Sequence, residues 1–220
     1  MKTITIAGQT IDAGITKLDM NGKNIHDLTP LQELIDTEYL ALEENQITDL
    51  TPLNSLTKLK TLLLYHNKIK DITPVHALTG LTILSFWDNS IEDITPLQEL
   101  INLTNLGLSK NKIADVKPLQ TLTSLIEVDL EHNIISDVTP LQALYNLPKL
   151  YLSDNRIKDI SPLQTLVNLT ELGLYENQIT DLTPLYSLTK LTKLELQKNP
   201  LTETQINELR NVLPSCEILF

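Results

Sequence analysis

This 220-residue sequence has little of several features that define large classes of protein. Its single cysteine, Cys216, excludes a disulfide within the chain, which is typical of a reducing compartment. No apolar run approaches the roughly 18 residues that a membrane-spanning helix needs. Aromatic residues make up only 4% of the chain, so leucine must supply most of the core.

Positive charge is also scarce, because 17 lysines and arginines face 28 acidic residues and leave a net charge of −11. Nucleic acids and anionic membranes require a basic surface, so neither is an expected partner. The first eight residues contain a lysine but no continuous apolar segment, so they do not resemble a secretory signal. We expect a cytoplasmic protein if the chain is complete, and a secreted or cell-surface protein if a signal was trimmed.

The feature that dominates the sequence is a repeat of 22 residues. Prolines recur at this spacing from Pro30 to Pro184, and asparagines recur from Asn45 to Asn199. A unit of this length cannot bury its own apolar face, so it must stack on its neighbours. We therefore predict a single elongated domain. Its parts are an N-terminal cap at 1–14, nine repeats at 15–201 and a C-terminal cap at 202–220.

Each unit begins with alternating apolar residues that predict a short strand. Leu62 and Leu64 are one such pair, and the same two positions are apolar in every unit. Adjacent units should place these strands side by side and parallel, about 4.8 Å apart. The asparagine falls at the end of the strand, where a buried amide can bond to backbone groups that the turn leaves unpaired.

The segment Asp-[Ile/Val/Leu]-Thr-Pro-Leu follows the asparagine and predicts a helical turn. The threonine hydroxyl should cap the turn, with proline at the first helical position. Few residues remain before the next leucine, which favours a 3₁₀ turn over an α-helix. We interpret the aspartates, from Asp27 to Asp181, as groups that bond to the turn, because their equivalent places speak against catalysis.

Together these residues resemble the leucine-rich repeat family in its 22-residue form, LxxLxLxxNxIxDITPLxxLT. That form is most familiar from bacterial internalins and from the leucine-rich regulatory subunit of protein phosphatase 1. The resemblance implies an α/β repeat fold, a right-handed solenoid with a concave parallel β-sheet and convex 3₁₀ turns. It also implies that partners bind to the concave side. Three positions depart from the pattern, namely Lys23, Thr37 and Lys117.

The two ends of a solenoid need caps that cover the core. At the N-terminus, Ile4, Ile6 and Ile11 flank Gly8-Gln9, which predicts a β-hairpin with a two-residue type II′ turn. At the C-terminus, the Thr202–Gln205 segment is a capping box.

Apolar residues at helical spacing follow the capping box and predict a cap helix, from Ile206 to Leu213. The last residues, Glu217 to Phe220, predict a final strand. Cys216 lies in this cap, where we interpret it as a buried structural thiol, and a reactive thiol is the alternative.

Four columns of residues should point from the concave sheet, at 13, 11, 9 and 8 residues before each proline position. Tyr65 and Trp87, the only tryptophan, are neighbours in one column. Exposed apolar patches mark binding surfaces, and Trp and Tyr are common interface anchors, so we predict that a partner protein binds here. Gly107 and Ser109 should leave open space beside the Trp87 ring. The alternative is that the rings only pack across the strands and stiffen the sheet.

The same columns hold far more acidic residues than lysines. Glu43, Glu44 and Asp88 border the aromatic residues without lysine neighbours, which predicts a partner with apolar anchors and basic flanks. A solvated acidic face that only keeps the protein soluble is the alternative. A ladder of alternating charge, Glu127, Lys149, Glu171 and Lys193, should pair with itself. The predicted partner-binding residues are Tyr39, Glu43, Glu44, Leu63, Tyr65, His66, Ile83, Trp87 and Asp88.

Catalysis and metal binding find little support. The sequence has no phosphate-binding loop, no HExxH and no nucleophile elbow. His66 and His132 share a column but should lie roughly 15 Å apart, too far to share a metal. Glu127, Asp129 and Glu131 step at about 7 Å, which is too far to chelate one cation unaided. We predict a monomeric, non-enzymatic, protein-binding module without a cofactor. A carbohydrate-binding surface or a purely structural spacer are the alternatives.

Overall fold

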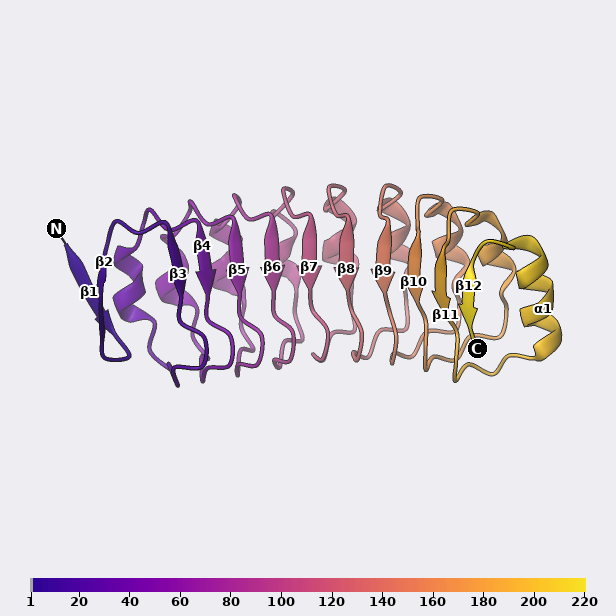
Figure 1. The fold of residues 1–220 in the computed structure, drawn as a ribbon, viewed down its shortest axis with the longest axis horizontal. Helices are drawn as coiled ribbons and strands as arrows, with labels where there is room; N and C mark the ends of the chain where they lie inside the picture. Colours follow the sequence, from indigo (N-terminus) through magenta and orange to yellow (C-terminus); the bar gives the residue numbers. More distant parts are fainter. Residues whose placement is uncertain (1) are drawn as a thin grey trace.

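The computed structural model describes residues 2–220 as a stack of repeated units. Ten short strands form one sheet in which neighbours are parallel and follow one another in chain order (Figure 1). These strands are β3 (Lys17–Asp19), β4 (Tyr39–Ala41), β5 (Thr61–Leu63), β6 (Ile83–Ser85), β7 (Asn105–Gly107), β8 (Glu127–Asp129), β9 (Lys149–Tyr151), β10 (Glu171–Gly173), β11 (Lys193–Glu195) and β12 (Glu217–Leu219).

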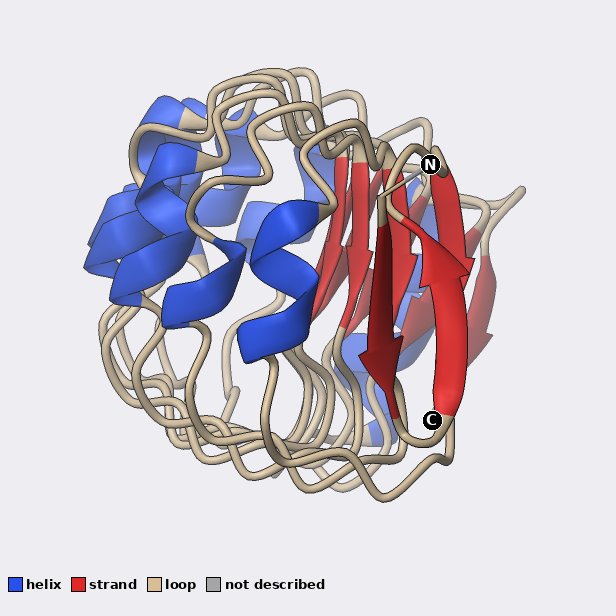
Figure 2. Cartoon of the chain, turned by 90° about the vertical axis from the view of Figure 1, so that its left-hand side faces the viewer, coloured by secondary structure: helices blue, strands red, loops and turns tan. Residues whose placement is uncertain are grey.

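Short 3₁₀ helices lie on the opposite side of the stack. Figure 2 shows the strands gathered on one side and the helices on the other, joined by loops at both edges. The 3₁₀ helices are η1 (Thr29–Glu33), η2 (Thr51–Leu53), η3 (Thr73–Ala77), η4 (Thr95–Leu97), η5 (Lys117–Thr121), η6 (Thr139–Ala143), η7 (Ser161–Thr165) and η8 (Thr183–Ser187). The expected leucine-rich repeat solenoid, with its parallel sheet and 3₁₀ turns, is therefore the observed fold.

The core between these two layers is a continuous column of aliphatic side chains. Leu62 and Leu64, the apolar pair of one unit, are fully buried, and the cluster extends from Ile4 to Ile218. Thr37 occupies a core leucine position and is also fully buried, where its hydroxyl donates to the Ile15 carbonyl at 3.1 Å. That bond satisfies the polar atom and makes the substitution tolerable.

The repeated asparagines form a ladder that links each unit to the one before it. The Asn133 side-chain oxygen accepts from the Ile113 backbone N–H at 2.9 Å. Its amide nitrogen donates to the carbonyls of Leu108 and Leu130, at 3.1 and 3.0 Å. Asn133 is 7% exposed, so a single buried amide satisfies several backbone groups at the turn. This confirms the role predicted for the column.

An aspartate, and not the expected hydroxyl, caps each 3₁₀ helix. The helix η3 begins one residue earlier than predicted, so its N-cap residue is Ile72 and proline takes the second position. The Asp71 carboxylate accepts from the Thr73 backbone N–H at 2.8 Å. Hydrogen bonds from the hydroxyl and N–H of Thr73 lower the pKa of Asp71. The aspartates thus bond to the turn as predicted, whereas the hydroxyl cap was wrong.

The N-terminal cap is a two-stranded antiparallel hairpin of β1 (Thr3–Ile6) and β2 (Gln9–Asp12). Its turn residues are Ala7 and Gly8, with φ of 47° and 74°, so the turn is of the I′ kind. The predicted hairpin is confirmed, but the predicted type II′ turn at Gly8-Gln9 lies one residue too far along the chain.

The C-terminal cap consists of α1 (Glu203–Val212) and β12, as predicted. Thr202 and Gln205 form the reciprocal capping box at the start of α1. Ile206 and Leu209 are fully buried against the last repeat. Cys216 is half-buried and not fully buried as predicted, and this burial raises the pKa of its thiol. Within residues 2–220, no helix is long and apolar enough to cross a membrane.

Candidate functional site

The register of the sheet aligns equivalent residues of successive repeats. Each residue pairs with the one 22 positions later, as Tyr39 does with Thr61 and Thr61 does with Ile83. Side chains that share a column in the sequence therefore lie side by side across the concave face. This brings the residues of the predicted site together on β4, β5 and β6 and on the turns that follow them.

Three rings form the centre of the predicted site, and we name Tyr65, His66 and Trp87 the aromatic cluster. The Tyr65 and Trp87 rings meet edge to face with centroids 5.7 Å apart. His66 and Trp87 meet in the same way at 4.5 Å. Such contacts stabilise the sheet, so cross-strand packing is part of their role. Tyr65 and Trp87 nevertheless remain half-buried and His66 is exposed, so the cluster still presents surface to solvent.

Apolar residues precede the aromatic cluster on β5 and β6, and a lysine lies over its tryptophan. Leu63 on β5 is half-buried, and Ile83 on β6 is 39% exposed. The Lys110 ammonium lies over the Trp87 ring, 4.6 Å from its centroid. Tyr39 has a similar partner, because Lys17 lies 4.5 Å from its ring centroid. The space expected beside Trp87 is therefore partly occupied by Lys110.

The column nearest the edge of the face has an unusual backbone. Glu44, His66 and Asp88 have φ of 55°, 51° and 56°, in the left-handed region that favours glycine. Gly22 holds the same place in the first repeat. This conformation turns the chain after each strand, and residue type alone did not predict it.

The acidic residues beside the cluster differ in how far they are already engaged by neighbouring polar groups. An Asp88 carboxylate oxygen lies 2.5 Å from His66 Nδ1, so Asp88 has a partner that the sequence analysis missed. Glu43 is half-buried and bonds to Asn21 through both its carboxylate and its backbone N–H. Burial, and then the neighbouring charge of Asp19, raises the pKa of Glu43. Glu44 is exposed at the edge of the face.

The predicted charge ladder on the C-terminal half pairs only in part. Lys149 and Glu171 form an ion pair at 3.1 Å, as expected. Lys193 instead pairs along its own strand with Glu195 at 2.6 Å. Among residues 2–220, no lysine pairs with Glu127, and its carboxylate accepts a hydrogen bond from the Asn105 amide at 3.5 Å.

A hollow of about 180 Å³ opens on the concave face over β7. Gly107 forms its floor, Ile83 stands on one side, and Glu127 and Asp129 stand on the other. Burial raises the pKa of Asp129 to about 6. The sequence analysis missed this hollow, although Gly107 beside two acidic residues in the next unit was the available sign.

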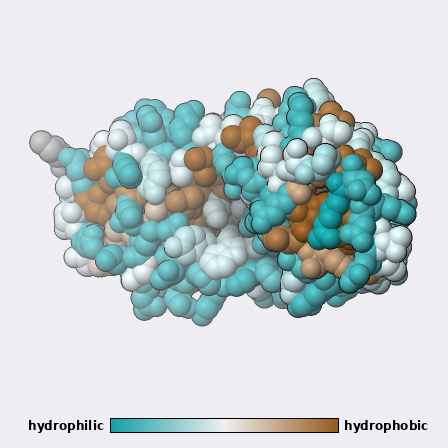
Figure 3. All heavy atoms as spheres, turned by 45° about the vertical axis from the view of Figure 1, so that its right-hand side comes forward, coloured by the Kyte–Doolittle hydropathy of each residue, from teal (hydrophilic) through white to brown (hydrophobic). Residues whose placement is uncertain are grey.

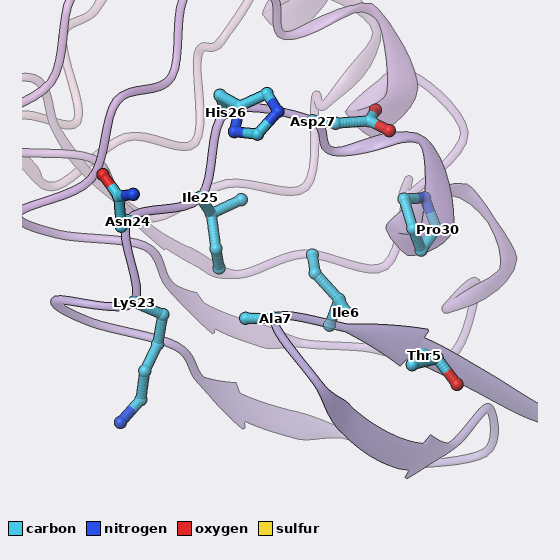
Figure 4. Close-up of a pocket in the computed structure, with 9 residues that line it drawn as sticks. All are labelled: Thr5, Ile6, Ala7, Lys23, Asn24, Ile25, His26, Asp27 and Pro30. Atoms are coloured by element: carbon cyan, nitrogen blue, oxygen red, sulfur yellow. The ribbon is translucent and has the colours of Figure 1, made fainter.

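A second cavity, of about 300 Å³, lies between the N-terminal hairpin and the first repeat. Figure 4 shows Ile6 and Ile25 pointing toward each other inside it, while Lys23 points away. Both isoleucines are buried, at 5% and 4% exposure, so the cavity marks the apolar seam between cap and repeat. It contains none of the predicted site residues.

On the face drawn in Figure 3, hydrophobic residues form separate patches among hydrophilic ones. Within residues 2–220, no group of three or more His, Cys, Asp or Glu side chains is arranged to hold a metal ion.

Comparison with known proteins places this architecture in a family. A family model described as leucine-rich repeats in two copies matches residues 38–74, 57–99, 101–143, 146–187 and 167–211. This chain belongs to the leucine-rich repeat family. Proteins with this fold typically serve as protein-interaction modules and not as enzymes.

Solved structures show that the repeats are of the internalin type. The chain is 32% identical to the internalin InlF of Listeria monocytogenes, with a TM-score of 0.78 over 93% of this chain and 66% of that one. It is 30% identical to the internalin C2 of the same bacterium, with a TM-score of 0.80 over 85% of this chain and 82% of that one.

A leucine-rich repeat protein of Leptospira interrogans is also similar, at 27% identity and a TM-score of 0.75, over 92% of this chain and 60% of that one. The chain thus spans less than two thirds of InlF and of the Leptospira protein. A comparison with the curated proteins finds no match.

Proposed function

We propose that this protein is a non-enzymatic binding module that holds a partner protein on its concave sheet at β4, β5 and β6. The aromatic cluster carries this proposal. A column position that faces solvent has no structural need for the single tryptophan of the chain, yet Trp87 is placed there in edge-to-face contact with Tyr65. Half-exposed aromatic and aliphatic groups of this kind are the usual anchors of protein interfaces.

The surroundings of the cluster define the partner further. Glu43 and Glu44 border it, and Glu44 is exposed. The partner that fits this surface packs apolar side chains against the exposed parts of the rings and places basic residues at the edge. Of the remaining predicted residues, Tyr39 and Asp88 would form the periphery of the contact.

A carbohydrate ligand is the second candidate, and the geometry of the rings argues against it. Stacking on a sugar requires an open ring face. Lys110 lies over the Trp87 ring, and Tyr65 and His66 meet Trp87 edge to face, so no flat aromatic platform is presented.

Replacing Trp87 tests the proposal. Trp87→Ala should weaken binding of a captured partner by about 2 kcal/mol, which is roughly 30-fold in Kd, because a central aromatic anchor is lost. The melting temperature should change little, since the ring is only half-buried. Titration calorimetry measures the first effect and thermal denaturation the second.

Tyr145→Ala provides the matched control, because Tyr145 is an aromatic residue that is 55% exposed and follows η6 on the other side of the stack. This variant should bind normally. If Trp87→Ala binds normally and unfolds earlier, the ring is a structural element and the proposal is wrong. Binding of the wild-type protein to a glycan array, with no protein captured, would favour the carbohydrate alternative.

A further inference from the structure

The hollow over β7 has the dimensions and chemistry of a side-chain pocket. Gly107 contributes no side chain to it, and a Cβ at this position would come within 3.1 Å of the Ser85 hydroxyl oxygen. The hollow is therefore open because β7 carries glycine here. One wall is aliphatic, at Ile83, and the opposite wall holds the carboxylates of Glu127 and Asp129.

The acidic residues on β8 and directly after it form no ion pairs in the part of the chain that the structure describes. In the described residues 2–220, no lysine, arginine or histidine forms an ion pair with Glu127, Asp129 or Glu131, which we name the β8 carboxylates. The nearby lysines are engaged elsewhere, because Lys110 lies over Trp87 and Lys149 pairs with Glu171. The chain thus leaves these three charges unneutralised while it pairs the acids of later repeats.

The third of these carboxylates, that of Glu131, points away from the hollow. A Cβ at Gly173 on β10 would lie 3.5 Å from a Glu131 carboxylate oxygen, 3.4 Å from Tyr151 Cδ1 and 3.0 Å from the Ser153 hydroxyl oxygen. Ser153 is 5% exposed, and among residues 2–220 its hydroxyl oxygen has no hydrogen-bond partner. Neither Glu131 nor Ser153 lines the hollow, so the carboxylates available inside it are those of Glu127 and Asp129.

The electrostatics of Asp129 point to the same ligand chemistry. Its pKa is raised to about 6, first by burial and then by the charges of Glu131 and Glu127. The backbone N–H of Glu131 and the side chain of His132 act in the opposite direction. Tyr151 on β9 also faces this group, and its hydroxyl donates to Glu171. A cation placed in the hollow would remove the cost of holding these charges together.

We propose that the hollow over β7 and the β8 carboxylates bind one basic side chain of the partner protein, with arginine preferred. The methylene groups would pack along Ile83 and over Gly107, and the guanidinium would donate to Glu127 and Asp129. The planar guanidinium suits two adjacent carboxylates better than an ammonium does. This proposal rests on the proposed function, in which the concave face holds a protein partner.

A short peptide tests the hollow without the partner. Acetyl-Gly-Arg-Gly-amide is titrated into the ¹⁵N-labelled full chain, and the amide resonances of Gly107 and Asp129 are followed. Saturable shifts are expected at pH 7.5. The same peptide with citrulline, which keeps the shape of arginine but has no charge, should bind at least 10-fold more weakly, and the lysine peptide should fall between the two.

Two variants separate charge from shape. Glu127→Gln/Asp129→Asn removes the carboxylates, and Gly107→Val fills the hollow while leaving them in place. Each should weaken arginine-peptide binding at least 10-fold. Gly107 does not require a left-handed backbone, so Gly107→Val should fold, and thermal denaturation checks this. Glu171→Gln on β10, where the carboxylate already has Lys149, is the matched control and should bind as the wild type does.

The pH dependence gives a further readout. Binding a cation favours the charged form of Asp129, so the arginine peptide should bind more weakly at pH 5 than at pH 7.5. Equal binding of the arginine and citrulline peptides, or unchanged binding by Gly107→Val, would overturn the assignment. If the peptide fails to bind while Trp87 is still needed for partner capture, this proposal alone is wrong. If the peptide binds but Trp87 is dispensable, the aromatic anchor is wrong instead.

Discussion

At the scale of single residues, Asp129 shows how a candidate ligand-binding group can oppose stability. The fold raises the pKa of Asp129 from 3.8 to about 6, mainly by burial. The folded chain therefore holds this proton more tightly than the unfolded chain does. The stability that the carboxyl contributes is fully present below pH ~4 and is lost as the pH rises through 6.

The substitution Asp129→Asn should therefore raise the free energy of unfolding more at neutral pH than at acid pH. Each pH unit between the two pKa values corresponds to about 1.4 kcal/mol, so we expect a relative gain of about 1 to 3 kcal/mol at pH 8. Urea denaturation at pH 8 and at pH 3.5 measures it. The control Glu99→Gln, at an exposed position, should show no such pH dependence. A stability difference that is the same at both pH values would contradict this account.

Some residue-scale features followed from the sequence and others did not. The buried asparagine ladder was predictable, because only a side chain with both a donor and an acceptor can serve that turn. The aspartate cap was not predictable in detail, because a threonine and an aspartate both stand near the proline and only geometry selects the acceptor. The left-handed column escaped prediction because it also holds residues such as Glu44 and Lys110, whose types seldom adopt that backbone.

At the scale of elements, the C-terminal cap was the most predictable part. Its capping box and helical spacing identified α1, and β12 pairs with β11 as the final strand. The hairpin turn at the other end was misplaced by one residue. Ala7 adopts a positive φ there, which alanine seldom does, so the glycine alone drew the prediction toward the next dipeptide.

Deleting residues 202–220 should unfold the end of the solenoid. Ile206 and Leu209 are fully buried, and the backbone N–H of Leu196 donates to the Leu219 carbonyl, so the deletion exposes the last core layer and an unpaired strand edge. Nearest-neighbour coupling then predicts fraying inward from this end. Hydrogen exchange should show lost protection in the last two repeats, with the central repeats less affected.

The control for the deletion is Val212→Ser, because Val212 belongs to α1 but is 38% exposed. This variant should keep native protection. A truncated chain that stays monomeric and fully protected through residue 196 would show instead that the cap is an appendage.

At the scale of the whole molecule, we propose that residues 1–220 behave as one domain. The described core is one continuous cluster from Ile4 to Ile218, and β12 and the N-terminal hairpin cover its two ends. The period of 22 residues made this architecture predictable, because the register of the sheet equals the repeat length.

The candidate site was predictable only in part. The columns of the concave face followed from the repeat, so the proximity of Tyr65 and Trp87 could be foreseen. The hydrogen-bond and ion-pair partners of each side chain could not be foreseen. Long side chains such as Lys193 can pair along a strand or across strands, and small energy differences decide between them. The hollow over β7 likewise depends on several neighbouring residues at once.

The charge of the whole molecule leads to a final prediction about association. A chain with a net charge of −11 attracts a basic partner at distances beyond the contact itself, and Glu43 and Glu44 place part of that charge beside the aromatic cluster. The on-rate should therefore fall as ionic strength rises and the screening length shortens, while the off-rate changes less. Stopped-flow or surface-based kinetics at low and high salt measures both rates.

Two variants of equal net charge test where the steering comes from. Glu43→Gln/Glu44→Gln should show a lower on-rate at low salt and a shallower salt dependence. Glu99→Gln/Glu208→Gln removes the same charge after η4 and on α1, away from the concave sheet, and should resemble the wild type. If both variants behave alike, the overall charge and not the concave face steers association. If the wild-type on-rate ignores salt, the carboxylates near the cluster have no part in it.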